Sequence, residues 1–161
     1  MTVLKLLGAA IIFGVSLYFL RAYRRFLHSR ISECESFLLF IEYMQREIGC
    51  RLRPVGEILQ GYKDEVLKGV GFLKDKPSDI SSSYLECEHK LSVGREGKEI
   101  LKRLFRDLGK SYREGTLALL EEARGKLLAY TEGVRGSLDA DVKLAAALIF
   151  GGGVGLLLLL L

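Results

Sequence analysis

Residues 144–161 carry no charged and no polar side chain. As a helix they would extend over roughly 27 Å, which is close to the thickness of the hydrocarbon core of a bilayer. A second apolar stretch, residues 3–20, contains Lys5 as its one charged residue. These two segments predict transmembrane helices at 3–20 and 142–161. The domain between them, residues 24–140, would then be held to a membrane at both ends.

A cleavable signal peptide is the alternative interpretation of the first segment. Its positive start and apolar stretch fit that alternative, but Arg21, Tyr23 and Arg24 stand where a small-residue cleavage site is expected. Only residues 6–20 are free of charge, so a spanning helix here needs Lys5 to extend toward the headgroups. We therefore expect a retained and slightly short anchor.

Basic residues next to the apolar segments predict the orientation in the membrane. Arg21, Arg24, Arg25 and Arg30 follow the first segment, and Lys143 lies at the start of the second. Because basic residues near membrane helices favour the cytoplasmic side, we expect the central domain in the cytoplasm and a location at the cell membrane. The odd number of cysteines, three at unpatterned spacings, also fits a reducing compartment.

The net charge of +4 does not indicate nucleic-acid binding. Lys5, Arg21, Arg24 and Arg25 lie in or beside the first apolar segment, and the remaining 20 basic residues equal the 20 acidic ones in number. A neutral domain offers no basic stripe for a phosphate backbone. The excess positive charge is better assigned to anionic lipid headgroups.

The central domain has a helical pattern throughout, with no alternating strand pattern of useful length. Apolar residues follow three-and-four spacing in residues 34–48, 55–66, 80–91, 100–108 and 117–134. We expect Gly49 to end the first helix, Pro54 to start the second and Gly69 to end it, and Ser81 or Ser82 to cap the third. The last helix should continue into the final apolar segment. The predicted fold is all-α, an antiparallel helical bundle flanked by the two transmembrane helices.

Small residues recur at four-residue spacing in both apolar segments. Gly151 with Gly155, and Ala10 with Gly14, have the spacing that lets membrane helices pack closely. We expect these faces to pack on each other, on a second copy of the chain in a homo-oligomer, or on neighbouring membrane proteins. The alternative is that they reflect the higher glycine content of membrane helices.

Candidate catalytic residues are few. Cys87 and His89 lie two positions apart, and on a helix such residues point to different sides, so they do not converge on one metal. Glycine-rich phosphate loops, the two-histidine zinc motif and a serine nucleophile elbow are absent from the sequence. We predict a protein that is not an enzyme and has no cofactor, metal or small-molecule substrate. A membrane-bound enzyme using Cys87 and His89 remains an alternative.

One charged turn stands apart from the other polar surface. Glu47, Arg51, Arg53 and Glu57 cluster around the turn that contains Pro54. A charged turn at the end of a bundle is a candidate partner-docking surface, and a merely solvated turn is the alternative.

Four segments resemble the stage III sporulation protein AB family. They are the opening LKLLGA, the turn REIGCRLRPVGEIL, the stretch LGKSYREG and the tail GGGVGLLLLLL. The resemblance spans the whole chain, and it rests on the order and spacing of these segments. The resemblance implies a platform-like component of the channel, or feeding tube, between mother cell and forespore, located in the mother-cell membrane around the forespore.

The same resemblance implies further properties. The domain would be similar to the cytoplasmic domains of type II secretion platform proteins, and its partners would be a cytoplasmic secretion-type ATPase and other stage III sporulation membrane proteins. It implies no catalytic or cofactor residues. An adaptor or sensor in the membrane, unrelated to sporulation, is the second alternative function.

Overall fold

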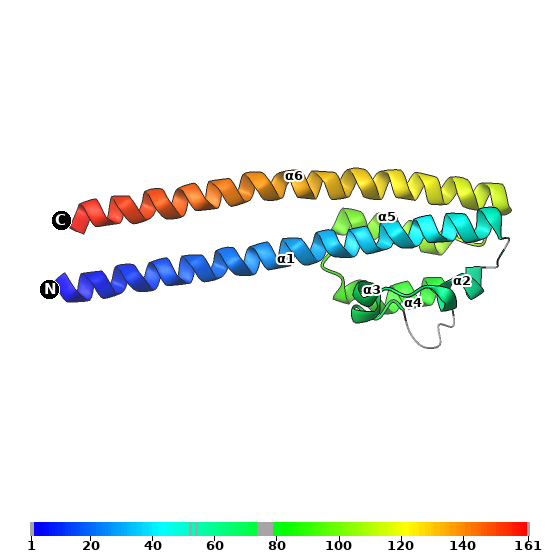
Figure 1. The fold of residues 1–161 in the computed structure, drawn as a ribbon, viewed down its shortest axis with the longest axis horizontal. Helices are drawn as coiled ribbons and strands as arrows, with labels where there is room; N and C mark the ends of the chain where they lie inside the picture. The colour runs from blue at the N-terminus through cyan, green and yellow to red at the C-terminus, as the bar shows by residue number, and fades with distance from the viewer. Residues whose placement is uncertain (1, 52, 54, 74–78, 161) are drawn as a thin grey trace. The chain divides into compact units, whose positions relative to one another are not determined.

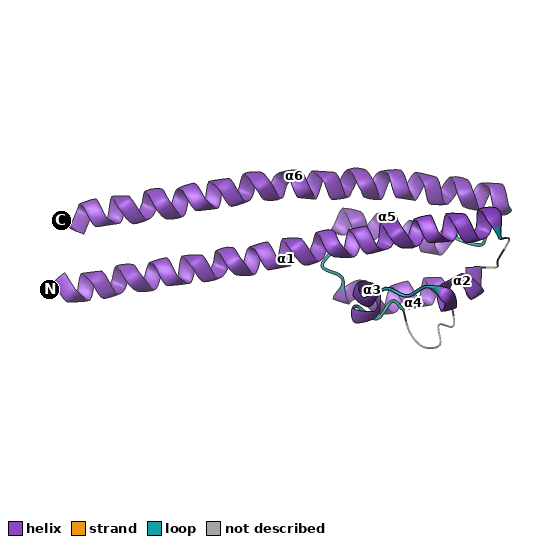
Figure 2. Cartoon of the chain, viewed as in Figure 1, coloured by secondary structure: helices purple, strands orange, loops and turns teal. Residues whose placement is uncertain are grey.

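The computed structural model describes the backbone of residues 2–51, 53, 55–73 and 79–160. Within these ranges, side chains are described except for residues 2–7, 9, 10, 12, 13, 16, 139, 141, 142, 145, 146 and 148–160. The described backbone is helical, with no strand (Figure 1, Figure 2). Its elements are α1 (Thr2–Cys50), α2 (Val55–Gly61), α3 (Glu65–Gly69), α4 (Ile80–Cys87), the 3-10 helix η1 (Glu88–Lys90), α5 (Arg95–Asp107) and α6 (Arg113–Leu160).

The chain divides into two compact units. The first, here called the terminal unit, comprises Met1–His28 and Val134–Leu161, and the second, here called the bundle, comprises Ser29–Gly133. Within the bundle, helices pack around one apolar core. The prediction of an all-α helical bundle is therefore confirmed.

The core of the bundle is built on one face of α1. Its buried members recur at three-and-four spacing: Cys34, Phe37, Phe40, Ile41, Met44 and Ile48. Aromatic rings from α4, from α5 and from the segment after α3 pack against them, with Phe37 and Phe72 centroids 5.2 Å apart in an edge-to-face arrangement. Phe105 lies 5.2 Å from both Phe72 and Tyr84. Such aromatic pairs add about 0.5–1.5 kcal/mol each beyond the area they bury.

Helices α1 and α6 run antiparallel through the bundle. At one end the Arg30 Nε donates to the Tyr130 hydroxyl at 2.7 Å, and at the other end the Arg113 Nε donates to the Ile48 carbonyl at 3.2 Å. Residue numbers therefore rise along α1 as they fall along α6. Both helices therefore pass out of the bundle at its Arg30 and Tyr130 end.

Several helix boundaries differ from those expected. The predicted second helix is two short helices, α2 and α3, because Asp64 accepts a hydrogen bond from the Leu67 N–H at 2.8 Å and starts a new helix there. Helix α1 includes Gly49 and ends one residue later. Helix α4 begins before Ser81, with Asp79 at the N-cap position. Pro54 lies outside the described residues.

The predicted transmembrane segment 3–20 lies in α1, and the segment 142–161 lies in α6 as far as Leu160, with residue 161 outside the described residues. In the part of the chain that the structure describes, no helix is both long enough and apolar enough to cross a membrane. Most side chains of the two predicted segments lie outside the described residues. The two spans therefore stay predictions.

Candidate functional site

The charged turn after α1 is organised by a buried carboxylate. The Glu47 side chain is 5% exposed, its Oε1 accepts a hydrogen bond from the Arg51 Nη1 at 2.9 Å, and its Oε2 lies 3.5 Å from the Arg53 Nε. Both arginine backbone N–H groups also donate to the Glu47 carbonyl, at 3.1 and 3.3 Å. Three of the four predicted docking residues are thus brought together. Glu57 lies on α2 with an exposed side chain, and the described contacts of this turn do not include it.

A basic residue of α6 completes this end of the bundle. Arg113 donates to the carbonyls of Ile48 and Gly49, two of the last acceptors of α1 that have no partner within the helix. A cation there also complements the negative end of the helix dipole. Beside this contact, a hollow of about 320 Å³ is lined by Tyr43, Arg46, Glu47, Cys50 and Arg51.

At the opposite end of the bundle, polar contacts join α1, α5 and α6. The Tyr130 hydroxyl accepts hydrogen bonds from the Arg30 guanidinium and, at 3.0 Å, from the Gly94 N–H that precedes α5. The Arg30 guanidinium carbon also lies 5.3 Å from the centre of the Tyr130 ring. A Cβ on Gly94 would lie 2.7 Å from the Tyr130 oxygen, so only glycine leaves room for this contact.

Buried Glu33 fixes the loop before α5. Its Oε2 accepts hydrogen bonds from the N–H groups of Ser92 and Val93, at 2.7 and 3.2 Å. Two backbone donors that would otherwise be buried without a partner are thereby satisfied by a carboxylate, which forms stronger hydrogen bonds than a neutral acceptor. This side chain thereby ties the loop to α1.

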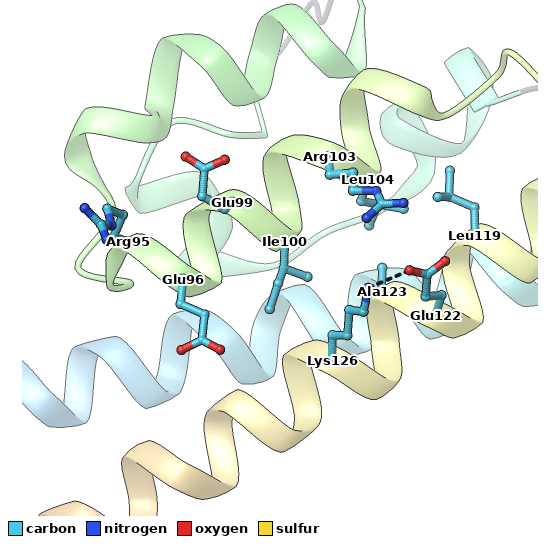
Figure 3. A pocket seen from close by; sticks show the side chains of 10 residues that line it. All are labelled: Arg95, Glu96, Glu99, Ile100, Arg103, Leu104, Leu119, Glu122, Ala123 and Lys126. Carbon is cyan, nitrogen blue, oxygen red and sulfur yellow. Dashed lines mark hydrogen bonds and ion pairs between the residues drawn. The ribbon is translucent and has the colours of Figure 1, made fainter.

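A groove of about 390 Å³ lies between α5 and α6 (Figure 3). Its lining residues are Arg95, Glu96, Glu99, Ile100, Arg103, Leu104, Leu119, Glu122, Ala123 and Lys126. Lys126 donates to Glu122 at 2.6 Å, and this hydrogen bond lowers the pKa of the Glu122 carboxyl. Three acidic and three basic side chains line the groove, so its charge favours neither an anion nor a cation.

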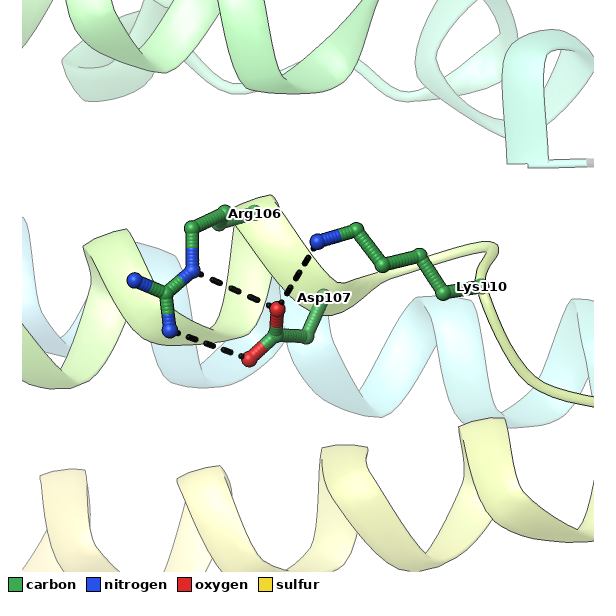
Figure 4. Close-up of polar contacts among 3 residues, drawn as sticks. All are labelled: Arg106, Asp107 and Lys110. Atoms are coloured by element: carbon green, nitrogen blue, oxygen red, sulfur yellow. Dashed lines mark hydrogen bonds and ion pairs between the residues drawn. The ribbon is translucent and has the colours of Figure 1, made fainter.

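The end of α5 carries a second surface cluster (Figure 4). The Asp107 carboxylate accepts hydrogen bonds from the Arg106 Nε at 3.3 Å and the Lys110 Nζ at 3.1 Å, and both lower its pKa. These groups are solvent-exposed, where such pairs contribute little to stability. The cluster lies at the turn after α5, in which Gly109 adopts a φ of 84°.

A family model described as stage III sporulation protein AB matches residues 5–161 of the chain. The chain belongs to the stage III sporulation protein AB family. The resemblance inferred from the four sequence segments is confirmed. No curated protein and no solved structure matches the chain. Membership implies a role in sporulation, so the alternative of an adaptor unrelated to sporulation is set aside.

The residues of the enzyme alternative lie in different surroundings. Cys87 is 1% exposed and its thiol donates to the Tyr84 carbonyl at 3.3 Å, whereas His89 is exposed on η1. No group of three or more His, Cys, Asp and Glu side chains among the described residues is arranged to hold a metal ion. The structure thus offers no observation that favours this alternative.

The predicted membrane-packing residues are mostly beyond the described side chains. Ala10, Gly151 and Gly155 are among those whose side-chain positions are not described. Gly14 is exposed, and a Cβ added there would have no heavy atom within 4 Å. Their role in helix packing stays a prediction.

Sequence reasoning missed the polar contacts at the exit of the two long helices. The sequence assigned no role to Glu33 or Tyr130, yet Glu33 is 5% exposed and both residues hold the segment before α5. The one sequence signal was position, since Glu33 comes directly before the apolar stripe that begins at Cys34. Its partners lie 59 and 60 residues away, a separation that helix periodicity does not address.

Proposed function

We propose that this protein is a non-catalytic membrane platform of the channel complex between mother cell and forespore, required for endospore formation. In this proposal it couples a cytoplasmic secretion-type ATPase to membrane components, and it works beside other stage III sporulation membrane proteins. The proposed location is the mother-cell membrane around the forespore, with the bundle in the cytoplasm. Family membership supports the sporulation role, and the remaining details rest on the arguments that follow.

The observation that carries the proposal is the antiparallel course of α1 and α6. Both helices leave the bundle beside the Arg30 to Tyr130 hydrogen bond, and each continues as a helix into an apolar end of the chain. Two helices that enter one membrane from one side need to leave their domain at the same end. The bundle satisfies this requirement.

Exposed apolar side chains support a lipid environment for the start of α1. Ile11, Val15, Tyr18 and Phe19 are each at least half exposed. In water such a surface is unfavourable by about 25 cal/mol for each Å² of apolar area, whereas a bilayer covers it. We infer that the two apolar ends anchor the bundle. The pairs Ala10 with Gly14 and Gly151 with Gly155 would then let these anchors pack closely, on each other, on a second copy or on other membrane proteins.

The contacts at the exit of the helices suggest how displacement would pass to the membrane. Tyr130 on α6 bonds both Arg30 on α1 and the Gly94 backbone before α5, while Glu33 on α1 holds Ser92. A force applied to the bundle would therefore reach both long helices together. This type of rigid connection needs no catalytic residue.

An insertion experiment tests the coupling. A seven-residue glycine-serine insertion after Gly136 interrupts α6, and a seven-residue alanine-rich helical insertion at the same place adds equal length and keeps the helix phase within about 20°. We expect the flexible insertion to abolish sporulation while membrane localisation is kept. The helical insertion should allow more sporulation than the flexible one. Normal sporulation with the flexible insertion would contradict the coupling.

A further inference from the structure

The turn after α1 presents arginine side chains that the bundle only partly neutralises. Arg46, Arg51 and Arg53 are exposed and are here called the arginine tip. Beneath them lies the single buried carboxylate of Glu47. Arg51 and Arg53 contact this carboxylate, and Arg46 lines the same hollow as Glu47 and Arg51. The three guanidinium groups and the one carboxylate carry a net charge of +2.

The contacts with Glu47 position Arg51 and Arg53 but leave most of their guanidinium N–H groups free to donate. Arg51 uses its Nη1 for the 2.9 Å hydrogen bond, and its side chain is 65% exposed. Arg53 lies 3.5 Å from the Glu47 Oε2 with a side chain 47% exposed. That oxygen accepts no hydrogen bond from the described residues, so the Arg53 guanidinium is held beside it by charge, while the Arg53 backbone N–H donates to the Glu47 carbonyl. Both guanidinium groups retain donors directed to solvent, because each carries five N–H groups.

We propose that the arginine tip binds an acidic segment of a partner protein, with carboxylates of that segment paired to the guanidinium groups of the tip. Guanidinium groups form bidentate hydrogen bonds with carboxylates, and Arg53 would give up no intramolecular hydrogen bond on forming one. This inference rests on the proposed function, because it names the chemistry of the partner that the platform receives on its cytoplasmic side.

The position of the tip argues against the headgroups of the anchoring membrane as its ligand. Arg30 lies where α1 leaves the bundle, and Arg51 comes directly after the other end of α1. The helix between them extends about 30 Å. This distance exceeds the Debye length of about 8 Å at physiological ionic strength several times. An anionic lipid of that membrane is therefore too far away, whereas a cytoplasmic protein reaches the tip directly.

The test uses the full chain in nanodiscs of neutral phosphatidylcholine and a fluorescent peptide of about ten glutamates as probe, followed by anisotropy at low salt. We expect the R51E/R53E variant to bind the peptide roughly tenfold more weakly, which is about 1.4 kcal/mol. The matched control R95E/R103E makes the same change of charge in the groove between α5 and α6 and should bind like the wild type. Circular dichroism of all three proteins checks that each is folded.

The peptide results decide the inference. Equal loss of binding in both variants would mean a general charge effect and would overturn the inference, as would a wild type that does not bind the peptide.

A second experiment tests purified secretion-type ATPase on the same proteins. ATPase binding that R51E/R53E leaves unchanged would remove the tip as its site and keep the proposed function. Selective peptide binding with no ATPase binding to the wild type would overturn the proposed function instead.

Discussion

At Cys34, burial changes the chemistry of a thiol. The side chain is 1% exposed, and this desolvation raises the pKa of the thiol to about 11, although a hydrogen bond with Thr131 and the charge of Arg30 lower it in part. The protonated form therefore prevails at neutral pH. Because the thiolate is the reactive species, Cys34 acts as a small core residue.

The raised pKa of Cys34 predicts a loss of stability at alkaline pH. The unfolded thiol, with its ordinary pKa of 9.0, loses its proton first, so the unfolded state binds fewer protons above pH 9 and stability falls as pH rises toward 11. We expect the wild type to lose about 1 kcal/mol more than C34A between pH 8 and pH 10. Urea unfolding of both proteins at each pH measures this difference, and parallel curves would contradict the assignment.

Removal of the buried Glu33 carboxylate should lower the stability of the bundle. Glu33→Ala leaves the Ser92 and Val93 N–H groups without their carboxylate acceptor, so we expect a decrease of about 2–3 kcal/mol in the free energy of unfolding. Glu132→Ala, an exposed change on α6, serves as control and should stay within about 0.5 kcal/mol. Equal urea midpoints for the two variants would show that Glu33 is not structurally required.

At the scale of elements, helix periodicity predicted most of the bundle. The apolar stripe of α1 and that of α5, with Leu101, Leu104 and Phe105, are buried as expected, and α6 runs without a break into the final apolar segment. The break between α2 and α3 was not predicted. The apolar spacing continues through it, whereas the cap at Asp64 is a local hydrogen bond that competes with helix continuation.

Two glycines in helices should respond oppositely to substitution by alanine. A Cβ on Gly97 in α5 would lie 2.5 Å from Val93 Cγ1 and 2.8 Å from Tyr130 Cε1, so Gly97→Ala should destabilise the bundle by about 1–3 kcal/mol. Gly125 in α6 has no heavy atom within 4 Å of an added Cβ. There the higher helix propensity of alanine should raise stability by up to about 1 kcal/mol. Thermal unfolding of both variants checks the sign, and a stabilising Gly97→Ala would contradict the packing described.

At the scale of the whole molecule, the sequence predicted the class of fold and the family but not the tertiary contacts. Charge counting predicted a neutral domain, but it does not predict how the charges are distributed, as with the three acidic and three basic side chains that line the groove between α5 and α6. The charged turn was recognised from Glu47, Arg51 and Arg53, yet burial of Glu47 beneath two arginines depends on how the end of α1 packs. Such burial follows from contacts between distant segments, which a single sequence does not specify.

The orientation of the chain in the membrane can be tested with its own cysteines. Cys50 is exposed, while Cys34 and Cys87 are buried, so a maleimide applied to the native protein should label Cys50 selectively. If the bundle lies in the cytoplasm, a membrane-impermeant maleimide should leave intact cells unlabelled and should label the protein after permeabilisation. The C50S variant should lose that label and thereby identifies its position. Labelling of Cys50 in intact cells would place the arginine tip outside the cytoplasm, where a cytoplasmic ATPase has no access to it, and the proposed coupling would then be untenable.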